Sequence, residues 1–377
     1  MTAPARSPRV LSVDVLRGLT VSGMVLVNNP GSWAHVYGPL RHAEWHGFTP
    51  TDTIFPFFLF IVGVAIPLAL GPRREGGARG LAVRVLRRGA VIFALGLLLQ
   101  ALPWFHLATV RIPGVLQRIA LCYAAAALLF LWTDGARGWR SQAGVAGALL
   151  AGYWILMTRV APPGGVAGDL SPAGNLAGYV DRLVLGPHIW QVAKVYDPEG
   201  ILSTLPAIGT TLLGVLAGHW IRGGSRAPRV AGGLALGGLA ATVVGFAWGL
   251  AFPINKSLWT SSYALFMAGL AALALAACYW IVEVRGWRGW TGPFVVLGLT
   301  ALPLFFLSSF VARLLYLLRV EPGGPRLQAW LFDHLFAPWL PPLDASLAYA
   351  LVYVLLWWAL MEALHRIAGR SGWRLRV

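Results

Sequence analysis

Imidazole, carboxylate and amide side chains are concentrated between Asn28 and Asp52. Strongly apolar segments lie on both sides of this stretch. Histidine and carboxylate groups are the usual proton carriers in enzymes, and amides supply hydrogen bonds without carrying charge. His42, Glu44 and His46 lie close together in the middle of this segment. The segment therefore predicts acid–base chemistry or the binding of a polar ligand at the edge of an apolar region.

Two residues of this segment also have purely structural interpretations. Pro50-Thr51-Asp52 resembles a helix start, so Asp52 either caps the helix that follows or serves the chemistry. His42 either bonds to backbone at a membrane interface or acts on a ligand. The sequence leaves both alternatives open.

Further polar residues interrupt or border the apolar stretches. Gln117 and Arg118 lie near the start of an apolar run in which no acidic residue is close by. A guanidinium inside a bilayer is costly, so we expect Arg118 to face a polar cavity or a partner on another helix. Four more residues lie at the mouths of other apolar runs and are candidates for a ligand site: Asp197, Glu199, Asn255 and Lys256. The alternative is that Asp197, Glu199 and Lys256 form a solvated salt bridge.

Asp14 and Arg17 are three residues apart and share one face of the first predicted helix. They either neutralise each other or leave Arg17 to meet an anionic ligand. No HExxH, CxxC, Walker A or GxSxG motif occurs, and Cys122 and Cys278 both lie inside apolar runs. We therefore expect no metal site and no nucleotide-driven motor.

The composition identifies the elements that must position these residues. Hydrophobic residues make up 57% of the 377 residues and charged residues 12%, against roughly 25% charged in a soluble domain. This excludes a soluble enzyme and indicates an all-α polytopic membrane protein. We predict one domain over residues 1–377 with about ten transmembrane helices: 11–29, 51–70, 89–106, 112–133, 143–158, 201–221, 230–252, 263–284, 291–311 and 345–366.

The arginines predict how the chain is oriented. The net charge of +16 comes from arginines in short connectors, where the positive-inside rule explains them without a nucleic acid partner. With both termini in the cytoplasm, 19 basic residues fall inside and 9 outside. That count includes Arg6, Arg374 and Arg376. We therefore predict cytoplasmic N- and C-termini.

Several of these residues occur in motifs that resemble one known family, the heparan-α-glucosaminide N-acetyltransferases, and especially its compact bacterial members. The motifs follow the same order and reach to about residue 310. They are Ser12-Val13-Asp14 through Arg17-Gly18, Val27-Asn28, His42-Ala43-Glu44-Trp45-His46-Gly47, Asp52 with Phe55-Pro56-Phe57, Ile112-Pro113-Gly114-Val115-Leu116-Gln117-Arg118, Asp197-Pro198-Glu199-Gly200 and Asn255-Lys256-Ser257-Leu258-Trp259.

The resemblance implies an enzyme that moves acetyl from cytoplasmic acetyl-CoA to the amine of a glucosamine-type sugar across the membrane. It places the active-site histidine at His42 and its neighbouring asparagine at Asn28. Either Asp52 or Glu44 is then expected to orient the imidazole and stabilise its cation. It also implies a multi-pass protein of a bacterial inner membrane, and a homodimer is compatible with it. The expected sugar-binding residues are Glu44, His46, Gln117, Arg118, Asp197, Glu199, Asn255 and Lys256, and the expected acetyl-CoA-binding residues are Asp14, Arg17, Arg87 and Arg88.

Two questions stay open at the level of sequence. His42 acts either as the base in direct transfer or as a carrier that is transiently acetylated. The alternative functions are an amino-sugar transporter and an O-acyltransferase that acts on a glycan of the cell envelope.

Overall fold

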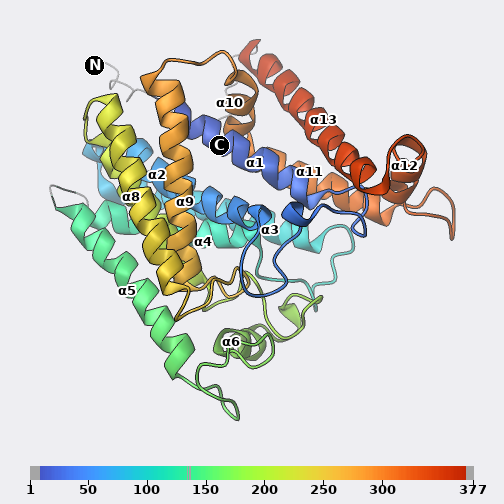
Figure 1. The fold of residues 1–377 in the computed structure, drawn as a ribbon, viewed down its shortest axis with the longest axis horizontal. Coiled ribbons are helices and arrows are strands. Elements are labelled where there is room, and N and C mark those ends of the chain that lie inside the picture. The colour runs from blue at the N-terminus through green and yellow to red at the C-terminus, as the bar shows by residue number, and fades with distance from the viewer. Residues whose placement is uncertain (1–8, 134, 136, 371–377) are drawn as a thin grey trace. The chain divides into compact units, whose positions relative to one another are not determined.

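The computed structural model describes residues 9–133, 135 and 137–370 of the chain, and these form helices and turns with no β-strand among them (Figure 1). The structure is thus that of an all-helical protein, as predicted. Arg6, Arg374 and Arg376, which enter the orientation argument, lie outside the described residues. Internal contacts divide the chain into two compact units, each of which is described by itself.

The length and apolar character of the helices indicate a protein that crosses a bilayer several times. Seven helices of the described residues are long and apolar enough for this, and the pair α10 and α11 adds an eighth if it counts as one span despite its 81° bend. The predicted segments 89–106 and 143–158 also form helices, α3 and α5, but these are less apolar. In α3 the reason is a series of arginines, Arg84, Arg87 and Arg88, on its N-terminal half. The number ten therefore remains a prediction.

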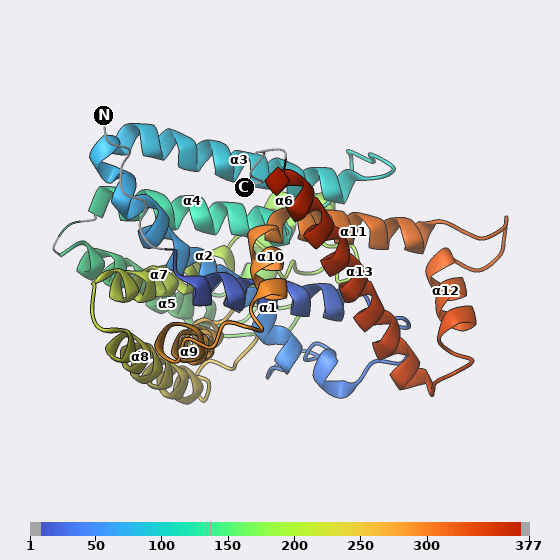
Figure 2. The same ribbon diagram turned by 90° about the horizontal axis from the view of Figure 1, so that it is seen from above.

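The first unit contains residues 44–48 and 56–285, preceded by the N-terminal residues up to Val13. Within it α8 runs along α9, α3 runs along α4, and α7 contacts both α4 and α5 (Figure 1, Figure 2). A buried apolar cluster with Ile66, Phe130 and Leu212 joins α2, α3, α4, α5 and α7. The helices are α2 (Ile54–Leu70), α3 (Ala78–Ala101), α4 (Val115–Thr133), α5 (Gly138–Arg159), α6 (Leu176–Leu185), α7 (Thr204–Arg222), α8 (Ala227–Trp248) and α9 (Ser261–Tyr279).

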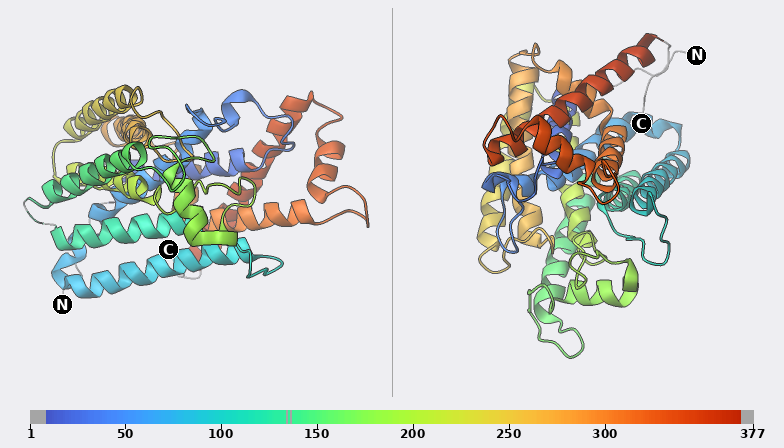
Figure 3. Two further views of the ribbon diagram at one scale, coloured as in Figure 1. Left: turned by 90° about the horizontal axis from the view of Figure 1, so that it is seen from below. Right: turned by 90° about the vertical axis from the view of Figure 1, so that its right-hand side faces the viewer.

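The second unit contains residues 14–43, 49–55 and the chain from Gly286 onward. Here α10 packs against α13, and α12 contacts both α11 and α13; Figure 3 shows the short α12 beside α13. Two short 3₁₀ turns, η1 and η2, shape the connection that follows α1. The elements are α1 (Leu11–Asn28), η1 (Gly38–Leu40), η2 (Pro50–Thr53), α10 (Gly292–Leu299), α11 (Ala301–Leu317), α12 (Leu327–Leu335) and α13 (Pro342–Arg370).

Two glycines allow α1 and α10 to approach until their backbones touch. A Cβ atom at Gly18 would overlap the carbonyl oxygen of Phe294, and one at Gly298 would overlap the carbonyl oxygen of Asp14. Small residues at such a crossing let helices pack closely where lipid gives no hydrophobic drive for their association. The glycine that follows Arg17 in the sequence is therefore a packing residue.

Gly18→Ala is expected to destabilise the protein by about 1–3 kcal/mol, because the new methyl group forces α1 and α10 apart. The measurement is the midpoint of thermal unfolding in detergent. Gly232→Ala is the matched control, since Gly232 on α8 is exposed and a Cβ there meets nothing within 4 Å. That variant should be unchanged or gain up to about 1 kcal/mol from helix propensity. Equal midpoints for the two variants would contradict the close crossing.

Candidate active site

A carboxylate holds the imidazole of His42. Nδ1 of His42 lies 2.7 Å from Oδ1 of Asp52, which precedes α2 in the turn η2. The His42 side chain is 51% exposed, whereas that of Asp52 is 1% exposed. The ring is thus anchored from a buried position and open on its other side to surroundings from which a ligand can approach.

The second oxygen of Asp52 is fully engaged by the local backbone. Oδ2 accepts hydrogen bonds from the N–H groups of Ala43 and Thr49, both at 3.0 Å, and from the hydroxyl of Thr49 at 3.2 Å. The bond to Thr49 forms a capping box at the start of η2. One oxygen of Asp52 therefore caps the helix start while the other meets His42.

This geometry determines which nitrogen of His42 is basic. A carboxylate without a proton only accepts, so Nδ1 donates its hydrogen to Asp52 and the neutral ring keeps its lone pair on Nε2. The same carboxylate stabilises the imidazolium that forms when Nε2 takes up a proton. The pair can therefore remove a proton from a nucleophile or carry an acyl group on Nε2.

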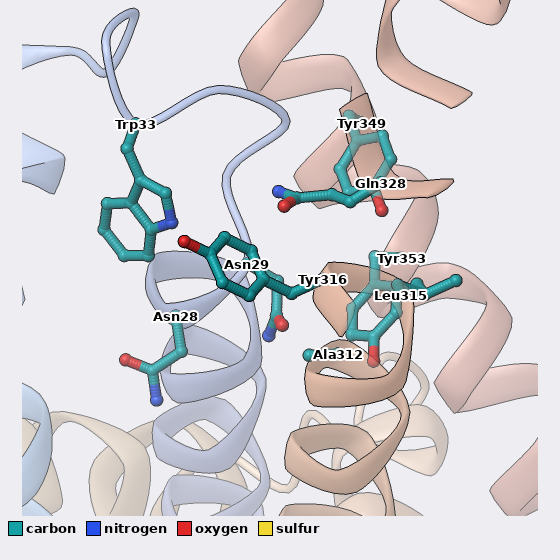
Figure 4. A pocket seen from close by; sticks show the side chains of 9 residues that line it. All are labelled: Asn28, Asn29, Trp33, Ala312, Leu315, Tyr316, Gln328, Tyr349 and Tyr353. Atoms are coloured by element: carbon teal, nitrogen blue, oxygen red, sulfur yellow. The ribbon is translucent and has the colours of Figure 1, made fainter. Parts of the chain in front are cut away.

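Asn28 ends α1 in the same unit and lies between two cavities. One has a volume of about 150 Å³ and is also lined by Tyr316, Gln328 and Tyr353 (Figure 4). The other, of about 160 Å³, is also lined by Ser308. The amide of Asn28 has no hydrogen-bond partner among the described residues, so its donors are available to a ligand. His42 lines neither cavity, and the structure thus shows these two residues in separate surroundings.

Asp14 and Arg17 form the pair that their spacing predicts. Nη1 of Arg17 lies 3.3 Å from Oδ1 of Asp14 and 3.5 Å from the carbonyl oxygen of Gly298 on α10. The side chains are 22% and 10% exposed. This geometry favours mutual neutralisation within the second unit.

In the first unit, Asp197 and Glu199 meet a cation that the sequence interpretation did not select. Arg111 binds Asp197 through two nitrogens, at 2.9 and 2.5 Å, and Glu199 at 2.5 Å. Burial lowers the pKa of Arg111, but the Glu199 and Asp197 carboxylates more than compensate and raise it above its ordinary value. Arg111 therefore stays charged. The signal was present in the sequence, since Arg111 opens the Ile112–Arg118 motif, but only the fold brings it to a partner 86 residues away.

Arg118 is almost completely buried, with 1% of its surface exposed. Its Nη2 donates to the carbonyl of Gly200 and the hydroxyl of Ser203, and the guanidinium lies 5.2 Å from the centre of the Trp259 ring. Its Nε and Nη1, like Nε2 of the adjacent Gln117, have no hydrogen-bond partner among the described residues. Arg118 thus finds partners for one nitrogen only, and they lie in the turn just before α7 instead of on another helix.

Asp181 on α6 also shapes this region and was not a sequence candidate. Its carboxylate accepts the N–H of Asp197 at 3.2 Å and the N–H of Ile201 at 2.8 Å, and it leaves no space for a side chain at Gly200. Burial raises the pKa of Asp181 to about 6, against the hydrogen bonds from Ile201 and Asp197 that lower it. Asp181 therefore holds the Asp197–Gly200 turn in place through backbone N–H groups at its two ends.

The remaining candidates differ in how far they are buried. Nδ2 of the buried Asn255 lies 3.4 Å from Nδ1 of His46, whose pKa burial lowers. Glu44 is exposed and Lys256 is partly buried. Arg87 and Arg88 are exposed on α3, where Arg88 lies over the Tyr123 ring. Among the described residues, no group of three or more His, Cys, Asp or Glu could hold a metal ion.

Known proteins are similar to this chain over most of its length. A family model described as the catalytic region of heparan-α-glucosaminide N-acetyltransferase matches residues 9–241. The chain is 30% identical to heparan-α-glucosaminide N-acetyltransferase of Mus musculus over 368 residues, which cover 81% of this chain and 54% of the mouse protein. The corresponding protein of Homo sapiens is 31% identical over 360 residues, 80% of this chain and 53% of the human one. The chain thus spans about half the length of these curated relatives.

Asp181 is expected to make the stability of the protein fall as pH rises. Its pKa is about 6 in the folded protein and 3.8 ordinarily, so the folded protein keeps this proton to higher pH than the unfolded chain does. Its stabilising contribution is therefore complete below the ordinary pKa and is lost as pH rises through about 6. We expect a loss of about 2 kcal/mol between pH 4.5 and 7, measured by thermal unfolding in detergent.

Asp181→Asn should remove this part of the pH dependence, whatever the variant costs at every pH. Asp169→Asn is the control, because hydrogen bonds from Ser171 lower the pKa of the exposed Asp169, which is thus ionised throughout this range. A pH dependence that is the same in Asp181→Asn and wild type would show that another group is responsible.

Proposed function

The chain belongs to the heparan-α-glucosaminide N-acetyltransferase family, and we propose that it transfers acetyl from acetyl-CoA to the amino group of a glucosamine-type sugar. The observation that carries this proposal is the pairing of His42 with Asp52. A half-exposed imidazole on a buried, hydrogen-bonded carboxylate has the form of a general base. It also lies in the part of the chain that the family model of the catalytic region matches.

In direct transfer, the amine nitrogen of the sugar attacks the thioester carbonyl carbon of acetyl-CoA. Nε2 of His42 takes the proton that the nitrogen loses, and Asp52 balances the imidazolium charge. The carbon–sulfur bond then breaks, the amide remains on the sugar, and the CoA thiolate leaves and takes a proton back from the imidazolium. No further reactant is needed.

The thioester oxygen carries negative charge during this attack and needs donors. The side-chain amide of Asn28 has its N–H groups available and is our candidate for this role. If His42 instead carries the acetyl group, Nε2 attacks the thioester first and the amine attacks the acetyl-imidazole second. Labelled acetyl that stays on the protein when acceptor is absent identifies the carrier route, and its absence identifies direct transfer.

The rest of the proposal concerns how substrates reach the site. Acetyl-CoA approaches from the cytoplasm, where the α3 arginines Arg87 and Arg88 attract its phosphates. The sugar approaches from the other side of a bacterial inner membrane, where Gln117, Arg118, Asp197, Glu199, Asn255, Lys256, Glu44 and His46 shape its path. Both termini are cytoplasmic, and the two units serve one acyltransferase domain.

His42→Ala is expected to lower acetyl transfer by about 10²–10⁴-fold, the usual contribution of a general base. The measurement is CoA released by purified protein in detergent with glucosamine as acceptor. His365→Ala is the matched control on the exposed C-terminal part of α13 and should keep wild-type activity. Near-native transfer by His42→Ala would eliminate both routes through this ring.

Asp52→Asn is expected to lower transfer by about 10²-fold or more while the protein stays folded. The N–H groups of Ala43 and Thr49 require an oxygen at the Oδ2 position, so the new NH₂ group points toward Nδ1 of His42. The ring then accepts at Nδ1 and holds its hydrogen on Nε2, which is no longer basic. CoA release that is unchanged in this variant would show that Asp52 only caps the helix.

The acceptor is expected to be an amine. CoA release should depend on glucosamine or chitosan oligomers and should be absent with glucose and with simple alcohols, since a hydroxyl is a much weaker nucleophile at neutral pH. Equal CoA release with hydroxyl acceptors would instead indicate O-acylation, and uptake of amino sugar into vesicles without acetyl-CoA would indicate transport.

A further inference from the structure

The cavity of about 150 Å³ beside the end of α1 has the size of one hexose ring. It lies entirely in the second unit, and its polar and aromatic lining comes from α1, the loop that follows it, and helices α11 to α13. Figure 4 shows the ring of Tyr316 reaching from α11 toward the end of α1 and toward Trp33. No role has yet been given to these side chains apart from Asn28.

Aromatic rings form both the base and the mouth of this cavity. Tyr349 and Tyr353 are 7% and 8% exposed, so they form its closed end. Trp33 and Tyr316 are 62% and 45% exposed and stand at its opening. Exposed aromatic faces next to polar groups suit a ligand with one apolar face and many hydroxyl groups. A pyranose ring is such a ligand, because its C–H bonds point to one face and its hydroxyls lie around the edge.

Contacts outside the cavity hold its side chains in place. Nε2 of Gln328 donates to the carbonyl of Pro30 at 2.9 Å, the guanidinium of Arg326 lies 3.7 Å from the Tyr316 ring, and the hydroxyl of Tyr353 donates to the carbonyl of Ser308 at 2.7 Å. The hydrogen bond to Pro30 fixes the side-chain amide of Gln328 and with it the direction of its carbonyl oxygen. The Asn28 amide offers both donors and an acceptor. The cavity is built before any ligand arrives.

None of the described residues that line this cavity carries a charge. An ammonium or carboxylate group that entered it would lose hydration without gaining a counter-ion, which is costly. The cavity therefore disfavours the protonated amine of glucosamine and the carboxylate of a uronic acid. It fits a neutral sugar that hydrogen-bonds to amides and tyrosine hydroxyls.

We propose that this cavity is a saccharide subsite that holds a neutral hexose unit of the acceptor, next to the amino sugar that receives the acetyl group. The identification of the ligand as part of the acceptor rests on the proposed function. The subsite lies against Asn28 at one end of α1. It therefore favours an acceptor longer than one sugar.

Binding to purified full-length His42→Ala protein without acetyl-CoA tests the subsite apart from catalysis. Calorimetric titration with N-acetylglucosamine should show binding that Tyr316→Ala and Gln328→Ala each weaken at least tenfold. Tyr316→Phe keeps the ring and should bind more tightly than Tyr316→Ala. Gln191→Ala is the matched control, since Nε2 of Gln191 also donates to a proline carbonyl, that of Pro187, but in an exposed loop of the first unit.

Turnover then connects the subsite with the acceptor. In the His42-containing enzyme, Tyr316→Ala should raise KM for a disaccharide acceptor at least tenfold with kcat changed less than twofold, and it should leave KM for glucosamine unchanged. Thermal unfolding midpoints equal to wild type show that the variants are folded. Loss of transfer in all proteins would count against the proposed function while the binding result still judged the subsite.

Three results would overturn the subsite. The first is unchanged binding of N-acetylglucosamine in folded Tyr316→Ala and Gln328→Ala proteins. The second is binding of protonated glucosamine or glucuronate as tight as that of N-acetylglucosamine, because the lining then would not select for neutral sugars. The third is displacement of the sugar by pantetheine at equal concentration, which would assign the cavity to the donor.

Discussion

The carboxylate of Asp52 is the interaction on which the rest of the site depends. It is buried, and it remains tolerable there because every direction around it carries a donor: two backbone N–H groups, a hydroxyl and an imidazole. The same four contacts join the start of α2 to the loop that carries His42. The charge of Asp52 thus orients the ring, closes the loop and caps the helix. A change to that charge affects all three.

A similar rule governs the first unit, with one exception. The carboxylates of Asp197 and Asp181 are buried, and each accepts backbone N–H groups, while Arg111 completes the surroundings of Asp197. Arg118 departs from the rule, since two of its nitrogens are buried without a partner among the described residues. Buried polar groups usually have hydrogen-bond partners, because an unpaired one lowers the stability of the folded protein. A carbonyl or anion that bound the free nitrogens of this guanidinium would remove that cost. We therefore propose Arg118 as a contact for substrate.

Local patterns predicted much of this structure, and long-range pairing did not follow from them. Apolar length placed most of the long helices within a few residues, and the spacing of Asp14 and Arg17 predicted their contact. It missed the start of α3, which lies eleven residues before the predicted one, and the short helices α6 and α12, which lie outside every predicted segment. The pairing of Arg111 with Asp197 and the support from Asp181 depend on how distant loops meet, which no window of sequence contains. The sequence suggests Lys256 as the cation for Asp197 and Glu199 in a solvated salt bridge, whereas the structure pairs these carboxylates with Arg111.

The break between α10 and α11 also departs from the prediction. Segment 291–311 is apolar throughout and reads as one span, yet the helix ends at Leu299 and restarts at Ala301 with a bend of 81°. The apolar pattern does not signal this, but Pro303 in the first turn of α11 does, because proline has no N–H to donate to the carbonyl of Leu299 and its ring clashes with that carbonyl. Composition thus predicts how much chain is apolar better than it predicts whether that chain is straight.

That break gives Arg17 a second role. A helix that stops in apolar surroundings leaves its last carbonyls without partners, and each costs free energy where water is scarce. Gly298 is one of these carbonyls at the end of α10, and Arg17 reaches it from α1 while Asp14 balances the charge. The bend therefore exposes a carbonyl that the Asp14–Arg17 ion pair satisfies. Relatives whose helix runs straight through this point would have no such carbonyl to satisfy, and the two features are expected to be gained or lost together in evolution.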